Sequence, residues 1–258
     1  MINRISILDV QEFKNNGEKF PMLTAYDYTT SKLIDQVGVP IILVGDSLGQ
    51  VVLGYDSTIP VTVDEMIYHT KAVGRGSERS LIVSDMPFMS YHIGLDQTLH
   101  NAARFVQEAG ANALKLEGGK AIADKVKRIV ECGIPVMGHL GLTPQSINQL
   151  GGYKLQGKTF DTAEQILEDA IALEEAGAFS IVLEVVPEPL AKLITEHISI
   201  PTIGIGAGKF CDGQVQVYHD LVGLFIDFYP KHAKRYGKLA DSIKESVEAY
   251  CNEVRSGE

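Results

Sequence analysis

Short apolar runs recur along the chain, and each of them ends in polar or glycine-rich residues. About eight can be recognised, the strand number of a (β/α)8 barrel: FPMLTAYD, PIILVGDS, SLIVSDMP, ALKLEGG, PVMGHLG, FSIVLEVVP, PTIGIGAG and VQVYHDLVGL. Segments with helical spacing lie between most of these runs, so strands and helices alternate. This alternation predicts an α/β fold, a (β/α)8 TIM barrel that forms a single domain over residues 1–258, with its active site at the C-terminal strand ends. A doubly wound open sheet is the competing fold, and it also places ligands at carboxyl ends of strands.

The clearest helical segment is residues 161–178. Asp161 is placed to cap its first turn, with Glu164 three residues later, and Gly177 is placed to end it. Residues 94–111 form a similar segment that ends at Gly110. Its expected apolar stripe consists of Leu95, Leu99, Ala102, Val106 and Ala109. Residues 238–254 predict one more amphipathic helix, which could cover the barrel or a neighbouring subunit.

The charge balance excludes some classes of partner. The chain has 33 acidic and 23 basic residues and a net charge of −10, which is a poor match for DNA or RNA. Its three cysteines show no paired spacing, so neither a disulfide framework nor a zinc cluster is indicated. The sequence has no signal-peptide pattern and no run of roughly 18 apolar residues. We therefore expect a cytoplasmic protein that does not bind nucleic acid or membranes.

The stretch ALKLEGG, residues 113–119, interrupts an apolar strand with two opposite charges. Because side chains alternate along a strand, Lys115 and Glu117 share one face while Leu114 and Leu116 share the other. A simple ion pair between Lys115 and Glu117 is one interpretation. The other is that both line a pocket in which each has its own partner.

Polar residues gather at the same end of several predicted strands. They are Tyr26, Asp27, Asp46, Ser47, Asp85, Lys115, Glu117, His139 and Glu184. One such acid is usually a helix cap or a solvated loop residue, but several buried carboxylates repel one another and need a cation to share. The phrases EAGANALKLE and EAGAFSIVLE place Glu117 and Glu184 at equivalent strand ends.

These side chains predict the chemistry of the site. The candidate ligands are almost all oxygen atoms, which favours a hard ion such as Mg²⁺ over Zn²⁺. Lys115 adds positive charge, so a 2-oxo acid that chelates the metal would suit the pocket. Metal polarisation of its keto group would acidify the adjacent carbon, and Glu184 is placed to remove the proton.

Three other motifs have competing interpretations. GDSL at 45–48 matches a serine-hydrolase signature, but the usual DxxH element does not occur in the sequence, which argues against Ser47 as a nucleophile. GIGAG at 204–208 lacks the third glycine of a phosphate loop and is better interpreted as a loop that allows close backbone approach to a ligand. His139 is either a core histidine bonded to backbone or a polar contact to substrate.

Several long blocks together resemble the ketopantoate hydroxymethyltransferase (3-methyl-2-oxobutanoate hydroxymethyltransferase) family. In order, from about residue 20 to 230, they are LTAYDYTTSKLIDQVGVPIILVGDSLGQVVLGYDST, SDMPFMSY, NALKLEGG, PVMGHLGLTPQS, IVLEVVP and IGIGAGKFCDGQVQV. The resemblance implies a Mg²⁺-dependent (β/α)8 barrel that transfers a one-carbon unit from 5,10-methylenetetrahydrofolate to 3-methyl-2-oxobutanoate. It also implies a homodecamer built from pentameric rings.

The resemblance assigns roles to individual residues. Asp46 and Asp85 correspond to the residues that hold the metal, and Glu117 to the third acidic group, either directly or through water. The substrate contacts correspond to Asp46, Ser47, Asp85 and Lys115. Glu184 corresponds to the proton acceptor, and Tyr26 and His139 are supporting candidates. Two alternatives to this function remain. One is a different Mg²⁺-dependent lyase or aldolase of 2-oxo acids, and the other is a carboxylate-binding scaffold.

Overall fold

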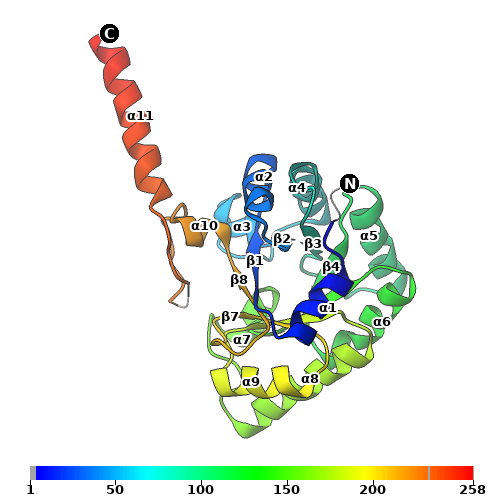
Figure 1. The fold of residues 1–258 in the computed structure, drawn as a ribbon. Coiled ribbons are helices and arrows are strands. Elements are labelled where there is room, and N and C mark those ends of the chain that lie inside the picture. The colour runs from blue at the N-terminus through cyan, green and yellow to red at the C-terminus, as the bar shows by residue number, and fades with distance from the viewer. Residues whose placement is uncertain (1–3, 232, 258) are drawn as a thin grey trace. The chain divides into compact units, whose positions relative to one another are not determined.

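A computed structural model describes residues 4–231 and 233–257 of the chain (Figure 1). The chain falls into two compact units, Met1–Val215 and Gln216–Glu258. The first unit contains the residues that the sequence predicts to be functional. The expectation of a single domain over 1–258 stays a prediction.

The described residues form a closed parallel barrel in which the strands follow one another in chain order. The strands are β1 (Phe20–Thr24), β2 (Ile41–Val44), β3 (Leu81–Asp85), β4 (Ala113–Glu117), β5 (Val136–Gly141), β6 (Ser180–Glu184), β7 (Thr202–Ile205) and β8 (Gly213–Gln216). The predicted (β/α)8 barrel is therefore confirmed, and the open sheet is excluded. One strand position was wrong: the run at 215–224 overlaps β8 only at its start, and Tyr218–Val222 is the helix α10.

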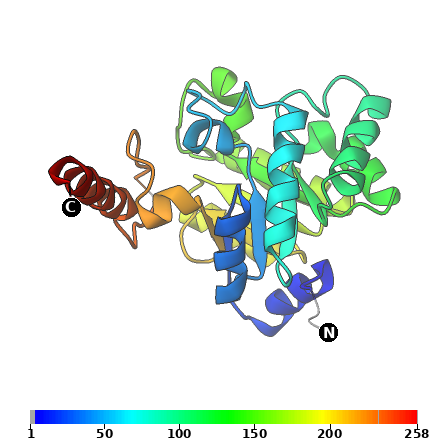
Figure 2. The same ribbon diagram turned by 90° about the horizontal axis from the view of Figure 1, so that it is seen from above.

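Helices separate most of the strands along the chain, with only a loop described between β7 and β8, and the helices of the first unit lie around the barrel (Figures 1 and 2). In the first unit they are α1 (Ile7–Asn16), α2 (Tyr28–Val37), α3 (Leu48–Val51), α4 (Val63–Gly76), α5 (Leu95–Gln107), α6 (Ala123–Glu131), α7 (Ile147–Leu150), α8 (Phe160–Glu175) and α9 (Glu188–His197). Short 3₁₀ turns, η1 (Lys120–Ile122) and η2 (Pro144–Ser146), follow β4 and β5. These turns place backbone next to the carboxyl ends of the strands.

Two details of the helices differ from prediction. Helix α8 is capped by Thr159, whose hydroxyl accepts from the Thr162 N–H, so Asp161 lies inside the first turn. The buried stripe of α5 consists of Thr98, Asn101, Ala102 and Phe105, while Leu95 is exposed. The stripe is shifted because small polar residues can face the barrel when they find hydrogen bonds there: Asn101 donates to the Ser90 carbonyl.

An apolar floor closes the lower part of the barrel. Buried side chains from every strand, together with Val10 of α1, form one cluster: Phe20, Met22, Ile41, Leu43, Leu81, Val83, Ala113, Met137, Phe179, Val182, Ile203 and Val215. Within β4 the alternation of side chains puts Ala113 in this floor, and Lys115 and Glu117 above it on the same face. The barrel is a filled core and not a pore.

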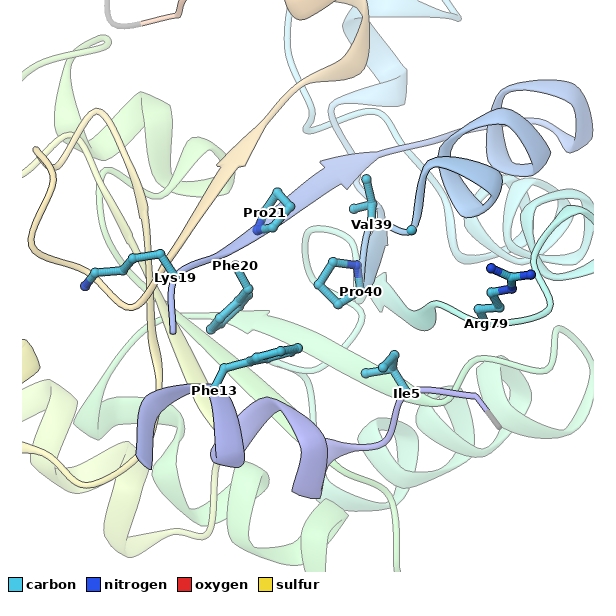
Figure 3. A pocket seen from close by; sticks show the side chains of 9 residues that line it. Ile5, Phe13, Lys19, Phe20, Pro21, Val39, Pro40 and Arg79 are labelled. Atoms are coloured by element: carbon cyan, nitrogen blue, oxygen red, sulfur yellow. The ribbon is translucent and has the colours of Figure 1, made fainter. Parts of the chain in front are cut away.

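A pocket of about 350 Å³ lies at the amino-terminal ends of β1 and β2 (Figure 3). It is lined by Ile5, Phe13, Lys19, Phe20, Pro21, Gly38, Val39, Pro40 and Arg79. The rings of Phe13 on α1 and Phe20 on β1 stack there, with centroids 5.3 Å apart. This lining is mostly apolar and includes none of the predicted site residues, which belong to the opposite ends of the strands.

The second unit contains α10 and α11 (Leu239–Ser256). The helix predicted at 238–254 is confirmed, and it has no buried residues. Its exposed apolar side chains include Ile243, Val247, Tyr250 and Val254. Among all the residues described, no helix is long and apolar enough to cross a membrane.

Asp35, near the end of α2, anchors the loop that leads into β3. Its carboxylate accepts hydrogen bonds from the backbone N–H groups of Glu78, Arg79 and Ser80, and from the hydroxyls of Ser77 and Ser80. Burial raises the pKa of Asp35, but these donors outweigh it and lower the pKa from 3.8 to about 2. The ionised form is therefore the one that stabilises the barrel.

We expect Asp35→Asn to lower the free energy of unfolding by about 2 kcal/mol at neutral pH. Because the folded-state pKa is depressed, this stabilisation is present above pH 4 and is lost as pH falls towards 2. Urea denaturation at several pH values measures it, with the exposed Asp56→Asn as control. If the difference in the free energy of unfolding between wild type and Asp35→Asn stays constant from pH 6 to pH 3, the ionised Asp35 carboxylate is not the source of the stabilisation.

Candidate active site

The register of the barrel brings the predicted residues to one place. Asp85 pairs with Lys115 across β3 and β4, Glu117 pairs with His139 across β4 and β5, and Gly141 pairs with Glu184 across β5 and β6. The first four of these side chains are at most 5% exposed. Glu184 is 15% exposed at its side chain, so it lies nearest to solvent.

The charged side chains form a chain of contacts across four strands, β3 to β6. Lys115 Nζ lies 3.1 Å from Asp85 Oδ1 and 3.1 Å from His139 Nδ1. His139 Nδ1 lies 3.2 Å from Glu117 Oε1, and its Nε2 lies 3.1 Å from Glu184 Oε2. Lys115 thus pairs with Asp85, Glu117 lies against His139, and His139 Nδ1 is a neighbour of both, so the two charges are not arranged as a simple pair with each other.

His139 connects the two glutamates. Its Nδ1 faces a donor, Lys115, and an acceptor, Glu117, so its protonation state decides which of the two it bonds. Burial and the Lys115 ammonium lower the pKa of His139, but Glu117 and Glu184 outweigh them and raise it to about 9. His139 is therefore a charged partner of carboxylates and not a core histidine bonded to backbone.

The loop after β2 supplies Asp46 and Ser47. The backbone N–H of Asp46 donates to Asp85 Oδ2 over 3.0 Å, which joins the ends of β2 and β3. Ser47 Oγ lies 2.8 Å from the hydroxyl oxygen of Tyr26, which follows β1. Asp27, by contrast, caps α2 by accepting from the Thr30 N–H, so this strand-end acid has a structural role.

The carboxylates differ in how easily they carry charge. Burial raises the pKa of Asp46 well above its usual range, and Asp85 and Glu117 raise it further. Burial also raises the pKa of Asp85, against the opposing effect of Lys115. For Glu117, His139 and Lys115 outweigh burial and lower the pKa. Burial lowers the pKa of Lys115, but the surrounding carboxylates outweigh it and raise it.

These observations fit a hard divalent cation beside Asp46 and Asp85. Four carboxylates face one ammonium and one imidazole, so negative charge is in excess. The buried Asp85 Oδ1 has the Lys115 ion pair but no aligned hydrogen bond. Both oxygens of Glu117 are occupied by His139 and the Gln145 N–H, and no three acidic, His or Cys side chains of the described chain are arranged as a finished metal site. Metal binding, with Glu117 as a direct or water-mediated ligand, stays a prediction.

Sequence reasoning missed Tyr91 and Gln145, which contact the predicted residues. The Gln145 side chain donates to Asp46 Oδ2 over 2.8 Å, and the Tyr91 hydroxyl accepts from the Glu117 N–H over 3.1 Å. Tyr91 ends the block SDMPFMSY and Gln145 lies in TPQS of η2, each several residues beyond a strand. The sequence signal that could have identified them is that both residues lie inside blocks that resemble the family.

The contacts around GDSL and GIGAG bear on the two remaining motifs, and approach of a ligand to the GIGAG backbone stays a prediction. The ring nitrogens of His139 contact acids and Lys115, and Ser47 Oγ contacts the Tyr26 hydroxyl, so within the described residues the GDSL stretch shows no serine–histidine pair. In GIGAG, a Cβ on Gly208 would lie 2.4 Å from Glu188 Cγ, and its φ is +77°. That glycine serves close packing of the loop after β7.

The chain forms a closed (β/α)8 barrel, and buried, opposed charges lie at the carboxyl ends of its strands. Enzymes with this fold have their active sites at that end of the barrel. The family model for ketopantoate hydroxymethyltransferase matches residues 4–258. The chain belongs to this family and is an enzyme of the hydroxymethyltransferase type.

Known relatives support this assignment along the whole chain. A 3-methyl-2-oxobutanoate hydroxymethyltransferase of Dehalococcoides mccartyi (strain CBDB1) is 61% identical over 254 residues, covering 98% of this chain and 91% of the relative. One from Clostridium botulinum (strain Langeland / NCTC 10281 / Type F) is 57% identical over 252 residues, covering 98% and 92%. The crystal structure of phosphonopyruvate hydrolase with oxalate and Mg²⁺ shares the fold at 12% identity, with a TM-score of 0.64 over 97% of this chain and 87% of that one.

Proposed function

We propose that the enzyme transfers a one-carbon unit from 5,10-methylenetetrahydrofolate to 3-methyl-2-oxobutanoate, giving 2-dehydropantoate and tetrahydrofolate. This would be the first step of pantothenate and coenzyme A biosynthesis. The observation that carries the proposal is the meeting of Lys115 and Asp85 with the His139–Glu184 contact at one mouth of the barrel. Family membership supplies the identity of the acceptor.

Asp46 and Asp85 would hold Mg²⁺, with Glu117 as the third acidic group. When bound, the metal would polarise the keto group of the oxo acid and so acidify its C3. Asp46 and Asp85 are both buried, and without a further cation the pKa of Asp46 is strongly raised. A metal ion beside them would supply the missing positive charge.

Lys115 and Ser47 would bind the oxo acid, together with the two aspartates. Lys115 keeps its ammonium because the acids around it raise its pKa, and its contact with Asp85 fixes its position. Tyr26 orients the Ser47 hydroxyl through their contact of 2.8 Å. The site therefore offers a fixed positive charge and an oriented hydroxyl to an anionic substrate.

Glu184 would accept the proton from C3. It lies at the end of β6, is the most exposed of the four acids, and contacts His139 Nε2 through one oxygen. That contact is an ion-pair distance without an aligned hydrogen bond, and it would leave the other carboxylate oxygen for the substrate. His139 is thus a supporting residue that links Glu184 to Glu117.

The test is direct. The protein, 3-methyl-2-oxobutanoate, methylenetetrahydrofolate and Mg²⁺ are mixed, and 2-dehydropantoate is measured by mass spectrometry with and without EDTA. We expect product that EDTA abolishes. Absence of product would overturn the proposal, and cleavage or condensation of another 2-oxo acid without folate would point to the lyase or aldolase alternative.

The cytoplasmic location and the homodecamer stay predictions that accompany this function. Light scattering of the purified protein would test the subunit number. A mass of one or two subunits over the concentration range of the activity assay would contradict the decamer.

A further inference from the structure

Tyr91 and Gln145 form a hydrogen-bonded pair, the Tyr91–Gln145 pair, beside the predicted metal ligands. Their side chains approach to 2.9 Å between the Tyr91 hydroxyl and Gln145 Oε1. Tyr91 is 1% exposed and Gln145 is 4% exposed. The proposed reaction assigns neither of them a role, although buried polar side chains in such a place need a reason.

Both the NH₂ group and the amide oxygen of the Gln145 side chain have hydrogen-bond partners. Its Nε2 donates to Asp46 Oδ2 over 2.8 Å and to the Met86 carbonyl over 3.0 Å, and its Oε1 faces the Tyr91 hydroxyl. Its backbone N–H donates to Glu117 Oε2 over 3.0 Å. One residue of the loop after β5 thus ties together the ends of β2, β3 and β4.

The Tyr91 hydroxyl determines which way the Gln145 amide faces. It accepts from the Glu117 N–H, so its single hydrogen is shared between the Glu117 carbonyl and Gln145 Oε1. The amide oxygen therefore lies on the Tyr91 side, and the NH₂ group faces Asp46. This orientation keeps an N–H donor 2.8 Å from Oδ2 of the buried Asp46 carboxylate.

We propose that the Tyr91–Gln145 pair is a positioning unit for the cation site. It holds Asp46 by one oxygen, Oδ2, and leaves the other oxygen for a cation. The inference rests on the proposed function, because that function places a divalent cation at Asp46. It concerns binding of the ion alone, so it can fail or stand separately from the reaction.

The experiment is calorimetric titration of the full chain with Mg²⁺, without substrate. We expect Gln145→Leu to raise the Kd for Mg²⁺ about 10-fold, since it removes a hydrogen bond to a charged group. Tyr91→Phe keeps the amide and should raise the Kd about threefold. In Gln145→Leu the backbone N–H of residue 145 can still reach Glu117, so the change in Kd reports on Asp46, whereas Tyr91→Phe also removes the hydroxyl contacts to the Glu117 backbone. Gln165→Leu, an exposed glutamine on α8, is the matched control and should leave the Kd unchanged.

The outcomes are distinct. If the wild-type chain binds Mg²⁺ and Gln145→Leu binds it equally well, the positioning role is overturned while the proposed function stands. A loss of unfolding free energy in Gln145→Leu with an unchanged Kd would also overturn it, because the residue would then be structural only. If the wild-type chain shows no Mg²⁺ binding, both the metal assignment and this inference fail. If Gln145→Leu binds Mg²⁺ more weakly than the wild-type chain, and the wild-type chain makes no dehydropantoate, the inference is supported and the proposed function is rejected.

Discussion

Glu184→Gln should slow exchange of the C3 proton of 3-methyl-2-oxobutanoate about 10³-fold, because the amide cannot accept the proton. Gln has the same length and can still approach His139 Nε2, which lies 3.1 Å from Glu184 Oε2 in the wild-type chain. Binding of the oxo acid in the presence of Mg²⁺ should therefore change by less than about threefold. Proton NMR in deuterated buffer measures the exchange without any folate.

Glu196→Gln is a suitable control for this variant. Glu196 is an exposed acid on α9, so its loss removes the same charge without touching the site. Exchange that continues at the wild-type rate in Glu184→Gln, with binding lost instead, would show that Glu184 holds the substrate and that another group is the base.

Lys115→Met should have the largest effect on stability. Removal of the ammonium leaves Asp85 buried without its ion-pair partner, 3.1 Å away in the wild-type chain. We expect the free energy of unfolding to fall by about 3–5 kcal/mol in the absence of divalent ions. Added Mg²⁺ should restore part of it, because the ion would replace the missing charge, and oxo-acid binding should stay weak.

A double-mutant cycle separates charge loss from packing loss. Lys115→Met combined with Asp85→Asn removes both partners, so it should be more stable than Lys115→Met alone. Lys127→Met on the exposed side of α6 serves as a surface control. If the single Lys115 variant unfolds at the same urea concentration as wild type, the ion pair with Asp85 does not have the role given to it here.

Much of the site could be predicted because strand geometry is local. The alternation along ALKLE put Lys115 and Glu117 on one face, and the structure confirms this, with Ala113 below them in the floor. The shared edge of parallel strands then brought Asp85 and His139 alongside. Neither step requires knowledge of how distant segments pack.

What the sequence could not provide depends on contacts between loops. Gln145 contacts Asp46, which is 99 residues away in the sequence. Nothing in the spacing of TPQS from its strand indicates this contact. The cap of α8 was misplaced for a related reason, since Thr159 and Asp161 are both good capping residues and only backbone geometry selects one. The last strand was set too late because VQVYHDL is compatible with both strand and helix.

The apolar floor lies under Lys115 inside the barrel. Side chains from all the strands fill this lower part, so the charged layer lies towards the carboxyl ends of the strands. If the proposed reaction takes place above this floor, both of its substrates would reach the charged layer from the same side, and the one that binds deeper would bind first. The order of substrate binding would then be set by apolar side chains that do not touch the reacting atoms.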